Sequence, residues 1–177
     1  GVREDLAVRA TDCRPTHDRE ESMLKVVSDT GYYRLPDLLA EELDLYRLEV
    51  ERFQRGEVSD GAFKAFRVPR GIYSQRGGQT YMVRLRVPAG GLTPIQMEAI
   101  ADLSERHGDG TPHVTSRQGV QVHGVRIEET AALLRELANV SLTTWGGGGN
   151  TIRNITACAE SGVCPEEAFD VTPHAVA

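Results

Sequence analysis

Apolar residues recur at helical spacing in three parts of the chain. Between Asp37 and Gln54 they fall at i, i+4, i+7, i+11 and i+14, which places them on one stripe of a helix. The stripe consists of Leu39, Leu43, Tyr46, Val50 and Phe53. Pro36 and Asp37 are typical of a helix start and Gly56 of a helix end, so we predict an ordinary packing helix here.

Two further helices are predicted downstream. The first begins at Thr93-Pro-Ile-Gln96, a capping box with proline at the first helical position, and runs to about His107. Gly108 is expected to end it as the residue just after the last turn. The expected inner stripe of this helix is Met97, Ile100, Ala101 and Ser104. The second helix covers about residues 129–138 and buries Leu133, Leu134 and Leu137.

Strands are predicted where apolar and polar residues alternate. Residues 80–87 place Met82, Arg84 and Arg86 on one face and four apolar residues on the other. Pro88-Ala-Gly-Gly91 then turns the chain. Two short strands are expected over about residues 113–116 and 120–125, with Gly119 between them, and a last one near residues 141–144. Residues 63–75 are expected to form a connector.

The resulting order β-α-β-β-α-β predicts an α+β, ferredoxin-like sandwich with an N-terminal helical extension. We expect an arm and helical extension over residues 1–66, the ferredoxin-like part over residues 67–146, and the start of another domain over residues 147–177. The glycine-rich segment 145–150 is expected to be a flexible junction. Because the segment after it is too short to fold as a domain, we expect the chain to be a piece of a longer protein.

Composition indicates a globular protein with a local anion site. Apolar residues make up 40% of the 177 residues, and no run of eighteen apolar residues predicts a membrane span. The odd count of three cysteines and the lack of a signal-peptide pattern favour a reducing compartment, so we expect a cytoplasmic protein. The net charge is −6, yet residues 67–126 carry 8 arginines against 4 acids. A basic middle in an acidic chain indicates a local anion site rather than nucleic-acid affinity.

The segment Thr115–His123 carries the most specific pattern, T-x-R-Q-x-x-Q-x-H. In an extended chain, alternate side chains point to opposite faces, so Thr115, Arg117, Gln121 and His123 can line one wall while Val114, Val120 and Val122 face the other way. Such a wall of donors suggests a polyanionic ligand. Taken alone, His123 fits a metal ligand, an acid–base group or a satisfied strand histidine, of which we favour the last.

Three other features each have two interpretations. Arg84 and Arg86 are either exposed strand residues or an anion-binding pair. The glycines before Arg153-Asn154 form either a linker or a loop that holds phosphate or carboxylate groups. Cys158 and Cys164, spaced C-x5-C, cannot by themselves complete a tetrahedral metal site or hold a four-iron cluster, so we expect an incidental pair.

These motifs together resemble the siroheme-dependent sulfite and nitrite reductases, which also carry a four-iron four-sulfur (4Fe-4S) cluster. The resemblance covers about residues 60–160, in a consistent order, and rests on the following segments: Gly71-Ile-Tyr-Ser-Gln75, Met82-Val-Arg84-Leu-Arg86, Gly90-Gly91, Thr115–His123 and Arg153-Asn154. It implies that residues 67–146 are the ferredoxin-like half domain of such an enzyme and that residues 147–177 begin its siroheme and cluster domain. It also implies a six-electron reduction, of sulfite to sulfide or of nitrite to ammonia.

The resemblance assigns roles to eight residues. Arg84 and Arg153 resemble the two arginines that hold the substrate anion and would be catalytic. The residues implied to bind siroheme are Thr115, Arg117, Gln121, Asn154, Gln75 and His123. Siroheme carries eight carboxylates in this family, and a basic wall is what such a polyacid requires, because unpaired buried carboxylates are costly.

One departure from the family limits what the isolated chain is expected to do. The family holds its cluster with cysteines in a C-x5-C … C-x3-C pattern downstream, and Cys158 and Cys164 stand too early for it, with no C-x3-C after them. We therefore expect the C-terminal half to supply the cluster, and the isolated chain to be inactive, to bind neither siroheme nor cluster, and to be able to self-associate.

The expected partners are that half, sulfite or nitrite, and an electron donor such as ferredoxin or a flavoprotein. Two alternatives remain: a tetrapyrrole- or anion-binding module without turnover, and a regulatory or nucleic-acid module. The second ranks low because exposed aromatic residues for base stacking are lacking.

Overall fold

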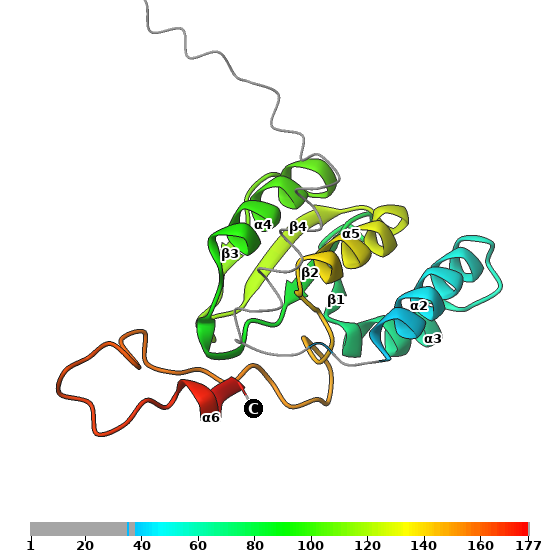
Figure 1. Ribbon diagram of the computed structural model, residues 1–177. Helices are drawn as coiled ribbons and strands as arrows, with labels where there is room; N and C mark the ends of the chain where they lie inside the picture. Colours follow the sequence, from blue (N-terminus) through cyan, green and yellow to red (C-terminus); the bar gives the residue numbers. More distant parts are fainter. Residues whose placement is uncertain (1–34, 36–37, 177) are drawn as a thin grey trace, which may run out of the picture.

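The computed structural model describes residue 35 and residues 38–176, so the arm predicted ahead of the first helix lies outside the described residues. Four antiparallel strands form one sheet in the order β1-β2-β4-β3. The strands are β1 (Ile72–Ser74), β2 (Tyr81–Leu85), β3 (His113–Val114) and β4 (Val120–Val125). The predicted strands at residues 80–87 and 120–125 are thus confirmed, whereas the one predicted at 113–116 ends at Val114. Figure 1 shows the sheet beneath two helices.

The topology confirms the α+β, ferredoxin-like fold with a helical extension. β2 is followed by helix α4 (Pro94–His107), the β3–β4 hairpin and helix α5 (Ile127–Asn139). The last strand, predicted near residues 141–144, is reduced to one bridge between Thr143 and Arg86 of the β2 segment. The strand prediction fails there because Ser141 has a positive φ of 58° and the chain turns away at Gly146, whose N–H donates to Pro69 O.

Helices α4 and α5 lie side by side on one face of the sheet (Figure 1). The capping box of α4 is confirmed, because Gln96 N–H donates to Thr93 Oγ1 while Thr93 N–H donates to Gln96 Oε1. The predicted inner stripe was wrong in part: Met97 and Ala101 are exposed. The buried residues of α4 are instead Gln96, Ile100, Leu103 and Ser104. The capping contacts fix the rotation of the helix, which apolar spacing alone left open.

Gly108 ends α4 in an extended conformation, with φ −122° and ψ −151°, and not as a left-handed cap. Glycine is required at position 108 for another reason. A Cβ at this position would lie 2.5 Å from His123 O and 2.8 Å from a methyl group of Val122. The close approach of the helix end to β4 therefore selects glycine here.

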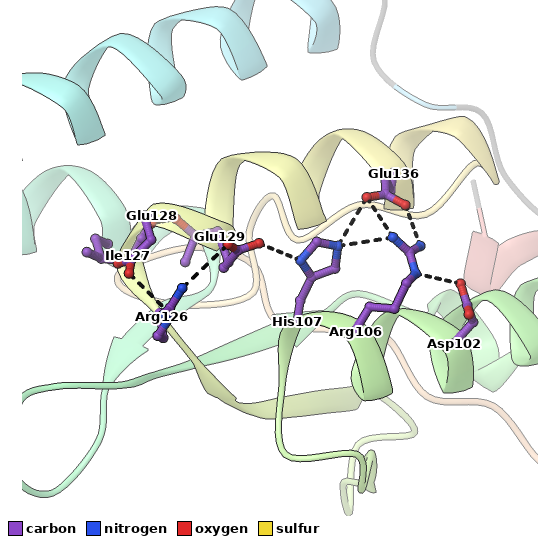
Figure 2. Close-up of polar contacts among 9 residues, drawn as sticks. Asp102, Arg106, His107, Arg126, Ile127, Glu128, Glu129 and Glu136 are labelled. Atoms are coloured by element: carbon purple, nitrogen blue, oxygen red, sulfur yellow. Dashed lines mark hydrogen bonds and ion pairs between the residues drawn. The ribbon is translucent and has the colours of Figure 1, made fainter.

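The α4–α5 pair is joined at its exposed edge by a cluster of charged side chains (Figure 2). His107 contacts Glu129 through Nδ1 at 2.9 Å and Glu136 through Nε2 at 3.1 Å. Arg106 donates to Asp102 at 2.9 Å on its own helix and to Glu136 on α5. These contacts tie the last turn of α4 to the first turn of α5 at Glu129 and to its C-terminal part at Glu136.

The predicted first helix is confirmed as α2 (Leu39–Gln54), and Tyr46 and Val50 of its stripe are buried. The connector predicted at residues 63–75 was wrong. The chain forms helix α3 (Asp60–Arg67), a 3-10 turn (Val68–Arg70) and then β1. Ser59 caps α3 by accepting from Ala62 N–H, and Phe63 stacks on Phe53 with centroids 4.1 Å apart. This tertiary packing, together with pairing of β1 to β2, organises a segment whose own pattern is weak.

The predicted flexible junction at residues 145–150 contains a packed loop. Gly146, Gly147 and Gly148 are buried. A Cβ at Gly147 would lie 2.7 Å from Arg84 O, and one at Gly148 would lie 2.5 Å from Val68 O and collide with the Tyr73 hydroxyl. The glycines therefore allow the loop to pass close to β1 and β2.

The chain after the glycine loop runs along the opposite face of the sheet from α4 and α5 and ends in a short helix, α6 (Thr172–Val176), that contacts the turn Pro88–Gly90. Ala89 N–H donates to Ile155 O at 2.9 Å, which fastens the start of this segment. In the part of the chain that the structure describes, no helix is long and apolar enough to cross a membrane.

Candidate anion-binding site

The sheet face that α4 and α5 leave uncovered carries a cavity of about 350 Å3. Strand β2, the β3–β4 hairpin, the glycine loop and the segment that follows it form its walls. The polar side chains of the lining are Arg84, Arg86, His113, Thr115, Ser116, Arg117, Gln121, Arg153 and Asn154. Six of the eight predicted site residues are therefore brought together, from segments that lie as far apart in the sequence as Arg84 and Asn154.

Charge distinguishes this cavity from the rest of the surface. Its lining contains four arginines and no aspartate or glutamate. Among the described residues, Arg84, Arg86, Arg117 and Arg153 form no ion pair, whereas seven other arginines do. Burial lowers the pKa of Arg84 from its ordinary value, and the charges of Arg153 and Arg117 add to this effect. A site that gathers like charges without counter-ions favours an anionic ligand.

Arg84 is held by groups on three sides. Its guanidinium lies over the Tyr73 ring, 5.2 Å from the centroid, and Nη1 donates to Gly147 O at 3.3 Å. When the Gln121 amide directs its oxygen toward Arg84, that oxygen accepts from Nη2 at 2.8 Å and from Nε at 3.0 Å. The fork is therefore fixed in orientation at the cavity wall.

Arg117 reaches the cavity from a turn, which corrects the predicted alternation. Residues 115–119 form the tight β3–β4 turn, in which Thr115 Oγ1 accepts from Arg117 N–H at 3.3 Å and from Gly119 N–H at 3.0 Å. Gln118 has a positive φ of 58°. The alternation predicted from Val114 onward breaks at this turn: Val114 is 81% exposed, while Val120 and Val122 are buried as predicted. Thr115 accordingly shapes the turn as well as lining the cavity.

Asn154 and Gln118 fix the segment that carries Arg153. Asn154 Nδ2 donates to Val87 O at 2.6 Å and to Arg117 O at 2.8 Å, while its Oδ1 is buried without a partner among the described residues. Gln118 exchanges two hydrogen bonds with Ala157, at 2.7 and 3.0 Å. Arg153 is therefore placed opposite β2 by amide contacts and not by regular secondary structure.

Gln75 and His123, which were predicted to bind the cofactor, are not among the residues that line the cavity. Gln75 Nε2 contacts His123 Nδ1 at 3.0 Å, and Gln75 Oε1 accepts from Gly124 N–H at 2.9 Å. His123 in turn contacts Gln121 through Nε2 at 3.2 Å. His123 lies two residues beyond Gln121 on the same face of β4, next to Gln75 in the loop that follows β1.

The environment of His123 disfavours its charged form. Burial lowers the pKa of this imidazole, and the nearby His113 and Arg84 lower it further, while Asp109 opposes them. The His113 and His123 rings lie 4.6 Å apart. His123 is therefore held neutral over a wider pH range than an exposed histidine.

Three polar lining residues were not among the predicted site residues: Arg86, His113 and Ser116. Arg86 was available from the sequence, since alternation places it on the same strand face as Arg84, and its Nε is buried without a partner among the described residues. His113 enters because β3 pairs it with Gln121, and no sequence pattern states that pairing.

The two described cysteines are not among the residues that line the cavity. Cys158 is exposed and Cys164 is half-buried, both in the segment after Arg153. In the residues with described positions, no group of three or more His, Cys, Asp or Glu side chains is placed to hold a metal ion. The chemistry available from this chain at the cavity is therefore that of hydrogen-bond donors and fixed positive charge.

Comparison with known proteins matches the region that builds the cavity. Residues 73–140 match the nitrite/sulfite reductase ferredoxin-like half domain. The chain is 30% identical over 158 residues to the chloroplastic ferredoxin–nitrite reductase of Arabidopsis thaliana, covering 88% of this chain and 25% of that protein. It is 41% identical over 76 residues to the sulfite reductase [NADPH] subunit beta of Schizosaccharomyces pombe, covering 43% of this chain and 5% of that protein.

A solved structure shares the fold. The NirA protein of Mycobacterium tuberculosis superposes with a TM-score of 0.65 at 20% identity, covering 75% of this chain and 28% of that one. The ferredoxin–nitrite reductase of Leptolyngbya laminosa is 34% identical over 91 residues, which are 51% of this chain and 18% of that protein. The chain thus spans about a quarter or less of the length of these relatives.

Proposed function

The chain belongs to the siroheme-dependent sulfite/nitrite reductase family and corresponds to an N-terminal region of these enzymes, so we propose that it supplies the cationic wall of a reductase site. The reaction would be the six-electron reduction of nitrite to ammonia or of sulfite to sulfide. The observation that carries this proposal is the cavity with four arginines and no carboxylate.

Arg84 and Arg153 would hold the substrate anion. Both line the same cavity, which supports the proposal that they bind one oxyanion together. Arginine presents donors in a planar fork that matches two oxygens of such an anion. As an N–O or S–O bond breaks, these donors would stabilise the charge that develops on the departing oxygen.

The lining also fits a carboxylate-rich cofactor. Arg117 and Arg86 remain as cations for carboxylates, and the unpartnered Arg86 Nε is a donor that such a group would satisfy. Thr115, Gln121 and Asn154 lie beside them, with Gln75 and His123 behind. A volume of about 350 Å3 is at the lower end for small-molecule sites, so it suits an oxyanion with the edge of a tetrapyrrole rather than the whole ring.

The metal centres would come with the rest of the enzyme. When bound, siroheme and the 4Fe-4S cluster would supply the electrons, while this chain binds, orients and polarises the anion. The missing C-terminal half would bring the cluster cysteines, and ferredoxin or a flavoprotein would serve as the electron donor in the cytoplasm. The isolated chain would be inactive.

A second candidate is a tetrapyrrole- or anion-binding module without turnover. The same cavity supports it, because a basic pocket binds anions whether or not chemistry follows. The two candidates differ in what happens once the downstream half is present.

The deciding experiment produces the chain together with a downstream half that carries the cluster cysteines, and assays it with reduced methyl viologen. Consumption of nitrite or sulfite supports the reductase. A cofactor-loaded assembly that turns over neither anion supports the module instead. The isolated chain should show no Soret band and no iron–sulfur absorption, and stoichiometric iron with labile sulfide in it would contradict the proposed division of the site.

A further inference from the structure

Four side chains form a continuous chain of contacts from the cavity wall to the loop after β1. Gln121 lies between Arg84 and His123, with 3.0 Å from Arg84 Nε to one end of its amide and 3.2 Å from the other end to His123 Nε2. Gln75 continues from His123 Nδ1 at 3.0 Å, and its Oε1 accepts from Gly124 N–H at 2.9 Å.

This series of side-chain contacts has a hydrogen-bond donor at each end, and the groups between the two ends offer one acceptor too few. Arg84 and the Gly124 backbone N–H can only donate. When a glutamine amide directs its oxygen toward one of these end donors, its NH2 group faces the other way. Both amides would then direct an N–H toward His123. A neutral imidazole has one lone pair and one N–H, so it can accept from only one of the two amides.

Either orientation of Gln121 therefore leaves one contact between two donors. With its oxygen toward Arg84, Gln121 donates to His123 Nε2, and the remaining proton on Nδ1 opposes the N–H of Gln75. With its nitrogen toward Arg84, Gln121 accepts from Nε2–H and Nδ1 accepts from Gln75, but two donors then meet at Arg84. A contact between two donors leaves a hydrogen bond unmade, which destabilises that arrangement.

The missing acceptor has a defined place, because Arg84 and Gln121 both line the cavity and Gln75 does not. We propose that an oxyanion in the cavity accepts from Arg84 and from the Gln121 amide, turns Gln121, and thereby sets His123 to its Nε2–H tautomer. The proposal rests on the proposed anion site. It makes Gln121 and Gln75 positioning residues that couple ligand binding to the state of an imidazole outside the cavity.

The groups around His123 support a tautomer switch rather than a charge switch. His113 on β3 lies against it, Arg84 on β2 is nearby, and only Asp109, in the loop after α4, favours a positive charge. Gln75 and Gln121 are neutral. With the pKa of His123 lowered, the ring stays neutral near physiological pH, where its single proton has to choose between the two nitrogens.

The test reads the imidazole tautomer of His123 by nitrogen-15 NMR in the 177-residue chain, at about two pH units above the ordinary histidine pKa of about 6.5. Nitrite, sulfite and acetate are titrated at constant ionic strength, with chloride as control. We expect the anion to convert His123 to predominantly Nε2–H. A response to nitrite or sulfite identifies a free oxyanion, and a response to acetate alone identifies the carboxylate of a cofactor.

Two isosteric variants test the series of contacts, because each should change the tautomer of His123 before any anion is added. Gln121→Glu supplies an acceptor to both Arg84 and His123, so it should fix Nε2–H and abolish the anion response. Gln75→Glu accepts from Gly124 N–H and from Nδ1–H, so it should favour the opposite tautomer. Equal tautomer ratios in both variants and the parent chain would overturn the proposal.

The outcomes separate this inference from the function on which it rests. If the Arg84 Nε–H signal responds to an oxyanion while the His123 tautomer stays unchanged, the coupling is wrong and the anion site stands. If Arg84 responds to none of the anions, the proposed anion site itself is contradicted.

Discussion

Asn154 donates from its side-chain amide to the backbone carbonyl of Arg117 at 2.8 Å and so fastens the segment after the glycine loop to the β3–β4 turn. The same nitrogen donates to Val87 O at 2.6 Å, at the end of the β2 segment. Arg153 stands one residue before this amide, and Arg117 carries one of the carbonyls that it holds. The positions of two cationic side chains in the cavity therefore depend on one neutral residue.

Replacing Asn154 by alanine should lower both stability and anion affinity. The change removes two hydrogen bonds, of which the one to Val87 O leaves that carbonyl with the Gly90 N–H as donor, and the loss costs about 0.5–1.5 kcal/mol of unfolding free energy per bond. It also frees Arg153 from its place opposite β2. Urea unfolding and a sulfite titration measure the two effects, with the exposed Asn150→Ala as control. Unchanged sulfite affinity in Asn154→Ala would show that Arg153 does not need this anchor.

Replacing Arg153 by alanine should weaken anion binding with little effect on folding. Arg153 forms no ion pair among the described residues, so its loss leaves no buried carboxylate unpaired. A tenfold or greater loss of oxyanion affinity is expected, equivalent to about 1.4 kcal/mol.

The matched control is Arg126→Ala, which removes the same charge from an exposed residue that pairs with Glu128 at 3.2 Å. In the complete enzyme, Arg153→Ala should reduce anion turnover much more than stability. Equal losses of turnover and stability would make Arg153 a structural residue.

Gly148→Ala should destabilise the chain, whereas Gly61→Ala should not. A Cβ at Gly148 would meet Val68 O at 2.5 Å and the Tyr73 ring, whereas one at Gly61 in α3 would meet nothing within 4 Å. Crowding of this kind costs about 1–3 kcal/mol, and alanine in a helix gains about 0.5–1 kcal/mol over glycine. Thermal unfolding of both variants compares them directly. A Gly148→Ala protein as stable as the parent would mean that the loop is free to move away from β1.

We expect the free energy of unfolding to fall at acidic pH, in part because Glu136 becomes protonated. Hydrogen bonding by Arg106 lowers the pKa of this carboxyl from its ordinary value of 4.5, burial opposes the effect, and His107 adds to it (Figure 2). A lowered folded-state pKa means that the stabilisation is present above the unfolded-state value and is lost as the pH falls through the folded-state value.

Glu136→Gln should therefore be less stable than the parent at neutral pH, by up to about 1 kcal/mol for a partly exposed pair, and the two curves should converge in acid. Glu128→Gln on the same helix is the control, because its partner Arg126 is exposed. Urea unfolding at a series of pH values provides the measurement. Curves that run parallel from neutral pH into acid would exclude Glu136 as a source of the acid loss.

Local sequence patterns were sufficient to predict the helices and strands that bury a single face. The α2 stripe, the Thr93 capping box and the leucines of α5 were predicted from spacing alone, since helix and strand periods are properties of the backbone. The pattern failed at residues 63–75, where Phe63 gains its burial from Phe53 on α2 and β1 gains its hydrogen bonds from β2. Such partners are distant in sequence, so no local window contains them.

By itself the sequence determined the chemistry of the site: the arginines, the hairpin residues and the glycines were all identified as residue types in a specific order. Only the tertiary structure decided which of them share the cavity. Pairing of β4 with both β2 and β3 brought Gln121 between Arg84 and His113 and left Gln75 and His123 outside the cavity lining, in contact with each other. Strand register and loop packing set these distances, and both depend on interactions between segments that the order of residues does not state.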